Sequence, residues 1–247
     1  MRTALLVVSF AVAMAACGRV GFDEGRVAFD AAGDAPPVPR ACAIDGVTLF
    51  CDDFELPDLA GWDHAVADVA RVGTPVRTGT GALRARIATG PEASWVGVAP
   101  PSFAAQPAVY LRVWAYVTGD SSLVQANLLT LLNSSTMEEL TVLGYGDELR
   151  LWRHTSSDEG YAAGAVVQRD RWICIELDVT VDDVAGRIEL RMDGTPAITD
   201  AGPVDTRVAG ELEYLNLGLP WTDTAQGAAT VHFDDVHLGT APVGCGS

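Results

Sequence analysis

The chain has 247 residues, of which 49% are hydrophobic and 20% are charged. This length and apolar content suit one large domain or two small ones, and they exclude both a mostly disordered chain and a mini-protein that depends on disulfides alone. Because 33 acidic residues outnumber 16 basic ones, the formal net charge is −17, which argues against binding to DNA or RNA.

The N-terminal sequence predicts an export signal. A positive residue precedes an apolar stretch from Ala4 to Ala16, which is typical of a secretory signal peptide and short for a membrane span. The sequence Met14-Ala15-Ala16-Cys17 resembles the lipobox of bacterial lipoproteins. The resemblance implies that residues 1–16 are removed and that Cys17 carries a lipid. The protein is then anchored through this lipid to a membrane of the bacterial cell envelope, and Gly18 favours the outer membrane. The alternative is an ordinary cleaved signal with an incidental cysteine.

Residues 17–40 follow as the lipidated N-terminus and a linker. They contain Gly, Asp and three Pro and show no sustained hydrophobic periodicity. This composition predicts a flexible tether. The alternative is that Phe22 and Phe29 dock on the domain that follows.

From about residue 41 onward, short runs of alternating apolar and polar residues are separated by turn residues. The clearest runs predict strands at 109–117, 148–154, 172–179 and 187–193. Further strands are predicted at 83–88, 95–98, 124–132, 139–145, 212–219 and 230–238. No window predicts a long amphipathic helix. Strands with one apolar face predict an all-β domain over residues 41–247, in which two antiparallel sheets pack face to face.

Several short motifs occur in order along this domain. They are Cys51-Asp52-Asp53-Phe54-Glu55, Gly61-Trp62, Gly79-Thr80-Gly81-Ala82-Leu83, Trp172-Ile173-Cys174-Ile175-Glu176-Leu177, a hairpin ending in Asp193-Gly194, and Val231-His232-Phe233-Asp234-Asp235-Val236. Together they resemble the concanavalin A-like jelly-roll superfamily, in particular its laminin-G-like branch, over most of the domain. The resemblance implies a two-sheet antiparallel jelly-roll sandwich whose first and last strands lie side by side. This superfamily holds lectins, glycanases, polysaccharide lyases and adhesion modules, so the fold alone leaves the function open.

Four cysteines remain besides Cys17, and an even number in an exported chain predicts two disulfides. The favoured pairing is Cys42–Cys51 with Cys174–Cys245. The first bond closes a short loop around the Asp45-Gly46 turn, and the second ties the C-terminal tail to the strand at 172–179. The alternative is Cys42–Cys245 with Cys51–Cys174, because the two ends of the domain are expected to meet.

Acidic residues cluster near both ends of the domain. If the first and last strands pair, Asp53 and Glu55 approach Asp234 and Asp235. Converging carboxylates repel one another unless a cation lies between them, and Ca²⁺ binds several oxygen ligands. The superfamily resemblance implies a structural Ca²⁺ made from such terminal residues. The alternative is a solvated acidic edge.

Two strands carry aromatic and basic residues on their polar faces. Those at 109–117 are Tyr110, Arg112, Trp114 and Tyr116, and a neighbouring stripe is predicted from Arg150, Trp152 and His154. Flat rings stack on sugar rings, and Arg donates paired hydrogen bonds to hydroxyls or carboxylates. This pattern predicts a ligand-binding face. The alternative is that both faces of the central strand are buried, or that Trp114 packs under a loop.

The sequence argues more weakly for catalysis. Glu176 and Asp178 share one strand face, but the third acid of the glucanase branch's Glu-x-Asp-x-(x)-Glu strand is missing. A lyase would draw its base and its uronate-neutralising group from Tyr116, His154, Arg112, Arg150 and Gln168, outside any known lyase motif. We therefore expect a surface-tethered, non-catalytic module that binds a glycan or an envelope protein. The alternatives are a polysaccharide-degrading enzyme and a purely structural envelope lipoprotein.

Overall fold

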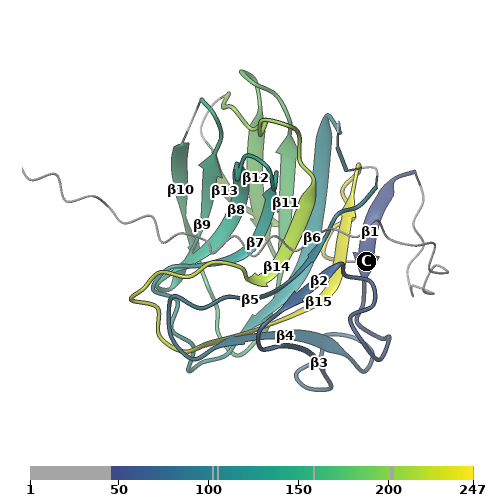
Figure 1. The fold of residues 1–247 in the computed structure, drawn as a ribbon, viewed down its shortest axis with the longest axis vertical. Helices are drawn as coiled ribbons and strands as arrows, with labels where there is room; N and C mark the ends of the chain where they lie inside the picture. Colours follow the sequence, from purple (N-terminus) through teal and green to yellow (C-terminus); the bar gives the residue numbers. More distant parts are fainter. Residues whose placement is uncertain (1–45, 102, 105, 158, 201–202, 247) are drawn as a thin grey trace, which may run out of the picture. The chain divides into compact units, whose positions relative to one another are not determined.

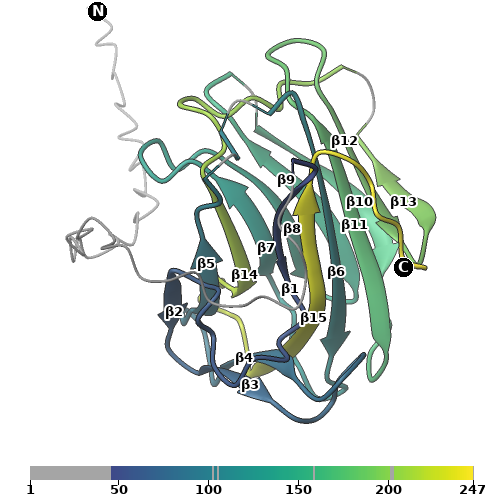
Figure 2. The same cartoon turned by 90° about the vertical axis from the view of Figure 1, so that its right-hand side faces the viewer.

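The computed structural model describes residues 46–101, 103–104, 106–157, 159–200 and 203–246. The predicted signal peptide, Cys17, the linker and Cys42 all lie outside the described residues. Within the described part, no helix is long and apolar enough to span a membrane. Two antiparallel β-sheets pack face to face there, as Figures 1 and 2 show, and this confirms the jelly-roll sandwich.

The first sheet has eight strands. They are β1 (Thr48–Asp52), β3 (Val69–Val72), β4 (Ala82–Ile87), β6 (Ala108–Val117), β11 (Trp172–Thr180), β12 (Arg187–Met192), β13 (Thr195–Thr199) and β15 (Ala229–Gly239). Their order is β13-β12-β11-β6-β15-β4-β3, and β1 pairs with β15 off this path. The first and last strands therefore lie side by side, as the superfamily resemblance implied (Figure 2).

The second sheet has seven strands. They are β2 (His64–Val66), β5 (Ser94–Val98), β7 (Ala126–Leu132), β8 (Glu139–Tyr145), β9 (Glu148–His154), β10 (Glu159–Val166) and β14 (Tyr214–Leu219). Their order is β10-β9-β8-β7-β14-β5-β2. Because β6 and β9 belong to different sheets, the prediction that their aromatic stripes are neighbours is wrong.

The core lies between the two sheets, and strand alternation explains its composition. In β6, the residues Val109, Leu111, Val113 and Ala115 are buried, while the residues between them are half-buried on the outer face. Trp62 of the Gly61-Trp62 motif is 7% exposed and belongs to the same buried cluster. The predicted Asp193-Gly194 turn joins β12 to β13, and both residues have positive φ, at 50° and 77°, as a type I′ hairpin requires.

The C-terminal tail is tied to the centre of the eight-stranded sheet. Cys174 in β11 forms a disulfide with Cys245, with their Cα atoms 5.9 Å apart. This confirms the favoured pairing for these two cysteines and excludes the alternative. Cys51 is also disulfide-bonded, and its predicted partner lies outside the described residues.

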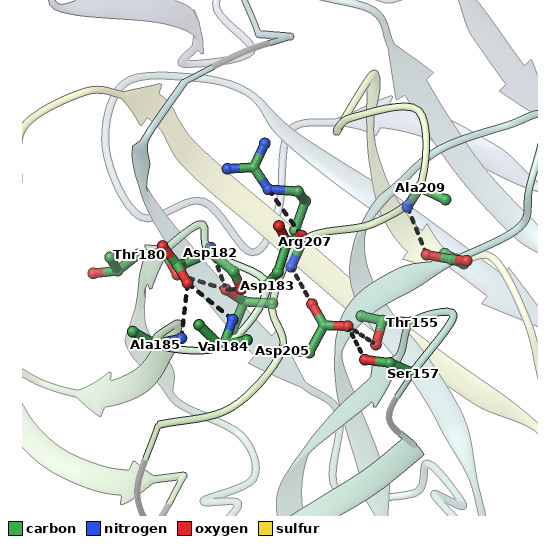
Figure 3. Close-up of polar contacts among 12 residues, drawn as sticks. Thr155, Ser157, Thr180, Asp182, Asp183, Val184, Ala185, Asp205, Arg207 and Ala209 are labelled. Atoms are coloured by element: carbon green, nitrogen blue, oxygen red, sulfur yellow. Dashed lines mark hydrogen bonds and ion pairs between the residues drawn. The ribbon is translucent and has the colours of Figure 1, made fainter.

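Polar contacts hold the connection between β13 and β14, which crosses from one sheet to the other (Figure 3). The buried carboxylate of Asp205 accepts hydrogen bonds from the hydroxyls of Thr155, at 2.9 Å, and Ser157 beyond the end of β9. Arg207 forms an ion pair with Asp183 at 3.2 Å in the connection between β11 and β12. These contacts link the connection to residues just beyond the ends of β9 and β11, which belong to different sheets.

Candidate functional site

Each sheet presents one face to the core and one outward, and the predicted ligand-binding residues divide between the two outer faces. Tyr110, Arg112, Trp114 and Tyr116 lie on the outer face of β6 in the eight-stranded sheet. Arg150, Trp152 and His154 lie on the outer face of β9 in the seven-stranded sheet. The two sets therefore cannot form one continuous surface.

The β6 stripe is engaged in contacts within the protein. The guanidinium of Arg77 lies 4.1 Å over the ring of Trp114, and Tyr116 packs against Trp172 with ring centroids 5.6 Å apart. Burial lowers the pKa of Arg112, although Asp235 and Glu176 counteract this effect. A sugar that stacked on Trp114 would have to displace the Arg77 side chain.

A more open group of rings lies on the outer face of β8, β9 and β10. We call it the ring face and define it as Tyr145, Arg150, Trp152, His154 and Tyr161. The rings of Trp152 and Tyr161 lie 4.2 Å apart and tilted by 37°, and Arg150 lies 3.7 Å over the ring of Tyr145. Tyr161 is 54% exposed and Tyr145 is 42% exposed, so part of each of these two side chains reaches solvent.

Glu139 lies beside this ring face on β8. Its carboxyl accepts side-chain hydrogen bonds from Thr141 and Trp152. Burial raises the pKa of Glu139, while those hydrogen bonds and the nearby His154 oppose the shift. Glu139 and His154 are direct cross-strand partners, so an acid and an imidazole stand next to the exposed rings.

The strand register extends the ring face into a row that crosses the whole sheet. From Tyr161 and Trp152 the row continues through Thr141, Thr130, Asn216, Gly97 and His64. Thr130 and Thr141 are almost fully buried, and their hydroxyls are 3.1 Å apart. The row is therefore closed at its centre and presents partly exposed side chains at its two ends.

The other end of the row carries a second aromatic group. The ring of His64 lies 6.4 Å from those of both Trp95 and Tyr214, with Asn216 on the same face of β14. Burial raises the pKa of Tyr214, and Glu213 and Asp63 add to this effect. The phenol therefore keeps its proton at neutral pH.

The predicted calcium ligands surround the loop between β3 and β4. The Glu55 carboxylate accepts hydrogen bonds from the Thr80 and Gly81 amides at 2.7 and 3.0 Å, and from the Thr80 hydroxyl at 2.8 Å. These hydrogen bonds hold the pKa of Glu55 below its usual value. Asp53 accepts from the Glu55 amide at 3.2 Å.

The acids of β15 hold the same loop from the other side. Asp234 accepts from the Arg77 and Thr78 amides at 2.8 and 3.3 Å, and Asp235 accepts from the Thr78 hydroxyl at 3.0 Å. N–H and O–H donors thus reach one or both carboxylate oxygens of each of these four acids. Among the described residues, one group brings three ligand atoms within 4.8 Å of one another, namely Cys174, Glu176 and Cys245, and its sulfurs are joined as a disulfide. Calcium binding by Asp53, Glu55, Asp234 and Asp235 therefore stays a prediction, and the hydrogen bonds of these four residues do not support it.

Sequence reasoning named three of the five residues of the ring face and missed Tyr145 and Tyr161. It also missed the group at the other end of the row. Tyr214 and Asn216 alternate with Leu215 and Leu217 in a predicted strand, and this alternation was a usable signal for an outer face. Tyr161 lies in β10, where small residues such as Ala162 and Gly164 hide the alternation.

Comparison with known proteins gives a likeness of fold. No protein-family model matches the chain, and no curated protein matches its sequence. Among solved structures, an endo-β-1,4-glucuronan lyase from the fungus Trichoderma reesei is similar, with 16% identity, a TM-score of 0.61, and coverage of 78% of this chain and 96% of that one. The cellulose-induced protein Cip1 has 21% identity and a TM-score of 0.59, and the match covers 80% of this chain and 100% of that one. The alginate lyase Aly36B has 9% identity and a TM-score of 0.56, with coverage of 80% and 98%. At these identities the likeness establishes the jelly-roll sandwich, and the function must come from the residues of the site.

Proposed function

We propose that this chain binds a polysaccharide through the ring face. The observation that carries the proposal is the pair of Trp152 and Tyr161, whose rings lie 4.2 Å apart beside Arg150 and His154. Aromatic rings stack on the apolar faces of sugars, while Arg and His donate hydrogen bonds to hydroxyls. The fold likeness to two polysaccharide lyases and a cellulose-induced protein supports a glycan as the ligand class.

Trp152→Ala is expected to weaken polysaccharide binding by about tenfold, because a central stacked aromatic ring contributes on the order of 1–2 kcal/mol. The measurement is affinity electrophoresis of the purified chain through gels that contain neutral, acidic or amino polysaccharides. The matched control is Trp221→Ala, since Trp221 is 38% exposed but lies outside the ring face. Equal effects of the two substitutions would contradict the placement of the site. Unchanged mobility of the wild type in every gel would favour an envelope protein as the partner instead.

A second candidate function is polysaccharide cleavage by β-elimination, and the group at the other end of the row favours it. Tyr214 keeps its proton, as a general acid requires, and the His64 ring lies 6.4 Å away on the same face. Because β-elimination requires a uronate, each acidic polysaccharide is incubated with the wild type whether or not the gels retard the protein, and the ultraviolet absorbance of unsaturated products separates an enzyme from a binding module. Product formation that Tyr214→Phe abolishes would establish the enzyme.

We further propose that the protein is exported and held at the cell envelope by a lipid on Cys17. The support is the apolar leader of residues 4–16 and the lipobox-like sequence that ends at Cys17. A tether would keep the ring face available to polysaccharides near the cell surface. Incorporation of labelled lipid that persists in Cys17→Ser would contradict this attachment.

A further inference from the structure

We infer that the ring face selects an amino-sugar polysaccharide that carries positive charge, rather than a polyuronate. The inference rests on the proposed glycan binding and specifies its substrate class. It follows from the charges that the strand register places around the Trp152–Tyr161 pair.

The first group of interest is the imidazole of His154. Its cross-strand partner on β8 is Glu139, and its cross-strand partner on β10 is Glu159. His154 therefore has a glutamate on each side. An incoming uronate carboxylate would meet two acids around the one imidazole of this face.

The second group of interest is the guanidinium of Arg150, which already contacts an acid and an aromatic ring. It lies 3.5 Å from the Glu148 carboxylate and 3.7 Å over the ring of Tyr145. Arg150 is 26% exposed and Glu148 is 46% exposed, so the acid is the more accessible partner of the pair. A uronate carboxylate would have to compete with Glu148 for this guanidinium.

Three carboxyl groups, those of Glu139, Glu148 and Glu159, thus stand around one permanent cation on this face, in a chain whose net charge is −17. This potential repels polyanions and attracts polycations. An ammonium group also binds favourably over the face of an aromatic ring, and Tyr161 is the more exposed ring of the pair, at 54%. A glucosamine polymer combines apolar sugar faces for stacking with ammonium groups for these acids, and so matches the ring face in both respects.

The test compares three oligosaccharides of equal length by calorimetry at pH 6 and low salt, using the purified chain. They are a glucosamine hexamer, an N-acetylglucosamine hexamer and a hexameric polyuronate. We expect the glucosamine hexamer to bind about tenfold more tightly than its neutral counterpart, and more tightly than the uronate, with an affinity that falls as salt is added.

The decisive variant is Glu148→Gln combined with Glu159→Gln, which removes two carboxylates and releases Arg150 while leaving the rings in place. We expect it to lose the preference for the glucosamine hexamer and to gain affinity for the uronate. The control is Asp58→Asn combined with Glu211→Gln, which removes the same charge from exposed positions outside the ring face and is expected to keep the preference.

The outcomes separate the inference from the proposed function. Tighter binding of the uronate or of the neutral hexamer by the wild type would overturn the inference and leave glycan binding intact. If the control variant loses the preference as fully as the decisive variant, overall charge sets the selectivity, and the assignment to the ring face is overturned. If none of the three oligosaccharides binds and the polysaccharide gels show no retardation, the proposed function fails and the inference fails with it.

Discussion

Removal of the disulfide between Cys174 and Cys245 is expected to lower the free energy of unfolding by about 4 kcal/mol. The bond closes a loop with a sequence separation of 71 residues. In the chain-entropy model a loop of this length restricts the unfolded chain by about that amount. Cys174 is fully buried in β11, so the bond also fixes the tail against the centre of the eight-stranded sheet.

The measurement is urea denaturation of the wild type and of Cys174→Ala combined with Cys245→Ala. Substitution is preferable to a reducing agent, because Cys51 is also disulfide-bonded and would be reduced as well. The control is Cys245→Ala alone, which also lacks the bond and is expected to lose a similar amount. A loss below about 1 kcal/mol in the double variant would show that the tail is held without the disulfide.

Much of the strand content of the fold could be predicted from the sequence, but the arrangement of the strands in sheets could not. The alternation of apolar residues located ten strands with ends close to those observed; the predicted range 148–154 is the observed β9 (Glu148–His154). Alternation reports that a strand has a buried face, and Leu149 and Leu151 carry that signal in β9. It does not report which sheet the strand joins. For this reason alternation alone could not show that the aromatic residues of β9 and those of β6 lie on opposite sides of the sandwich.

Some strands were not predicted from the sequence, and the physical reason differs between them. β2 and β3 have 3 and 4 residues, too few to show a period. β10 lies at the edge of its sheet and consists largely of small residues, so its pairing with β9 fixes it more than its own pattern does. Since Tyr161 belongs to β10, half of the ring pair that carries the proposed function depended on a strand that the sequence did not indicate.

Asp234→Asn and His232→Gln are expected to change the pH dependence of stability in opposite directions. Both residues lie on the outer face of β15, where they pair with Trp114 and Tyr116 of β6. Burial raises the pKa of Asp234 to about 6, with a contribution from Asp235, although three backbone amides donate hydrogen bonds to its carboxylate and lower it. Burial also lowers the pKa of His232 to about 4, and the nearby Arg84 adds to this effect.

These two shifts offset each other in the wild type. Between about pH 4 and 6, folded Asp234 keeps a proton that the unfolded chain has lost, so its contribution to stability falls as the pH rises. Over about pH 4 to 6.5, folded His232 lacks a proton that the unfolded chain holds, so its contribution rises with pH. Folded and unfolded chains therefore bind nearly equal numbers of protons at this pair near pH 5.

Each substitution leaves one of these contributions unbalanced. Relative to the wild type, Asp234→Asn is expected to gain stability with rising pH, and His232→Gln to lose it, by up to about 1.4 kcal/mol per pH unit. Urea denaturation at pH 4.5, 5.5 and 6.5, with a calcium chelator present throughout, measures both differences. Subtracting the wild-type curve removes the contribution of the other titrating groups. Differences that stay constant over this range would show that these side chains have ordinary pKa values in the folded protein, and that the outer face of β15 is open to water.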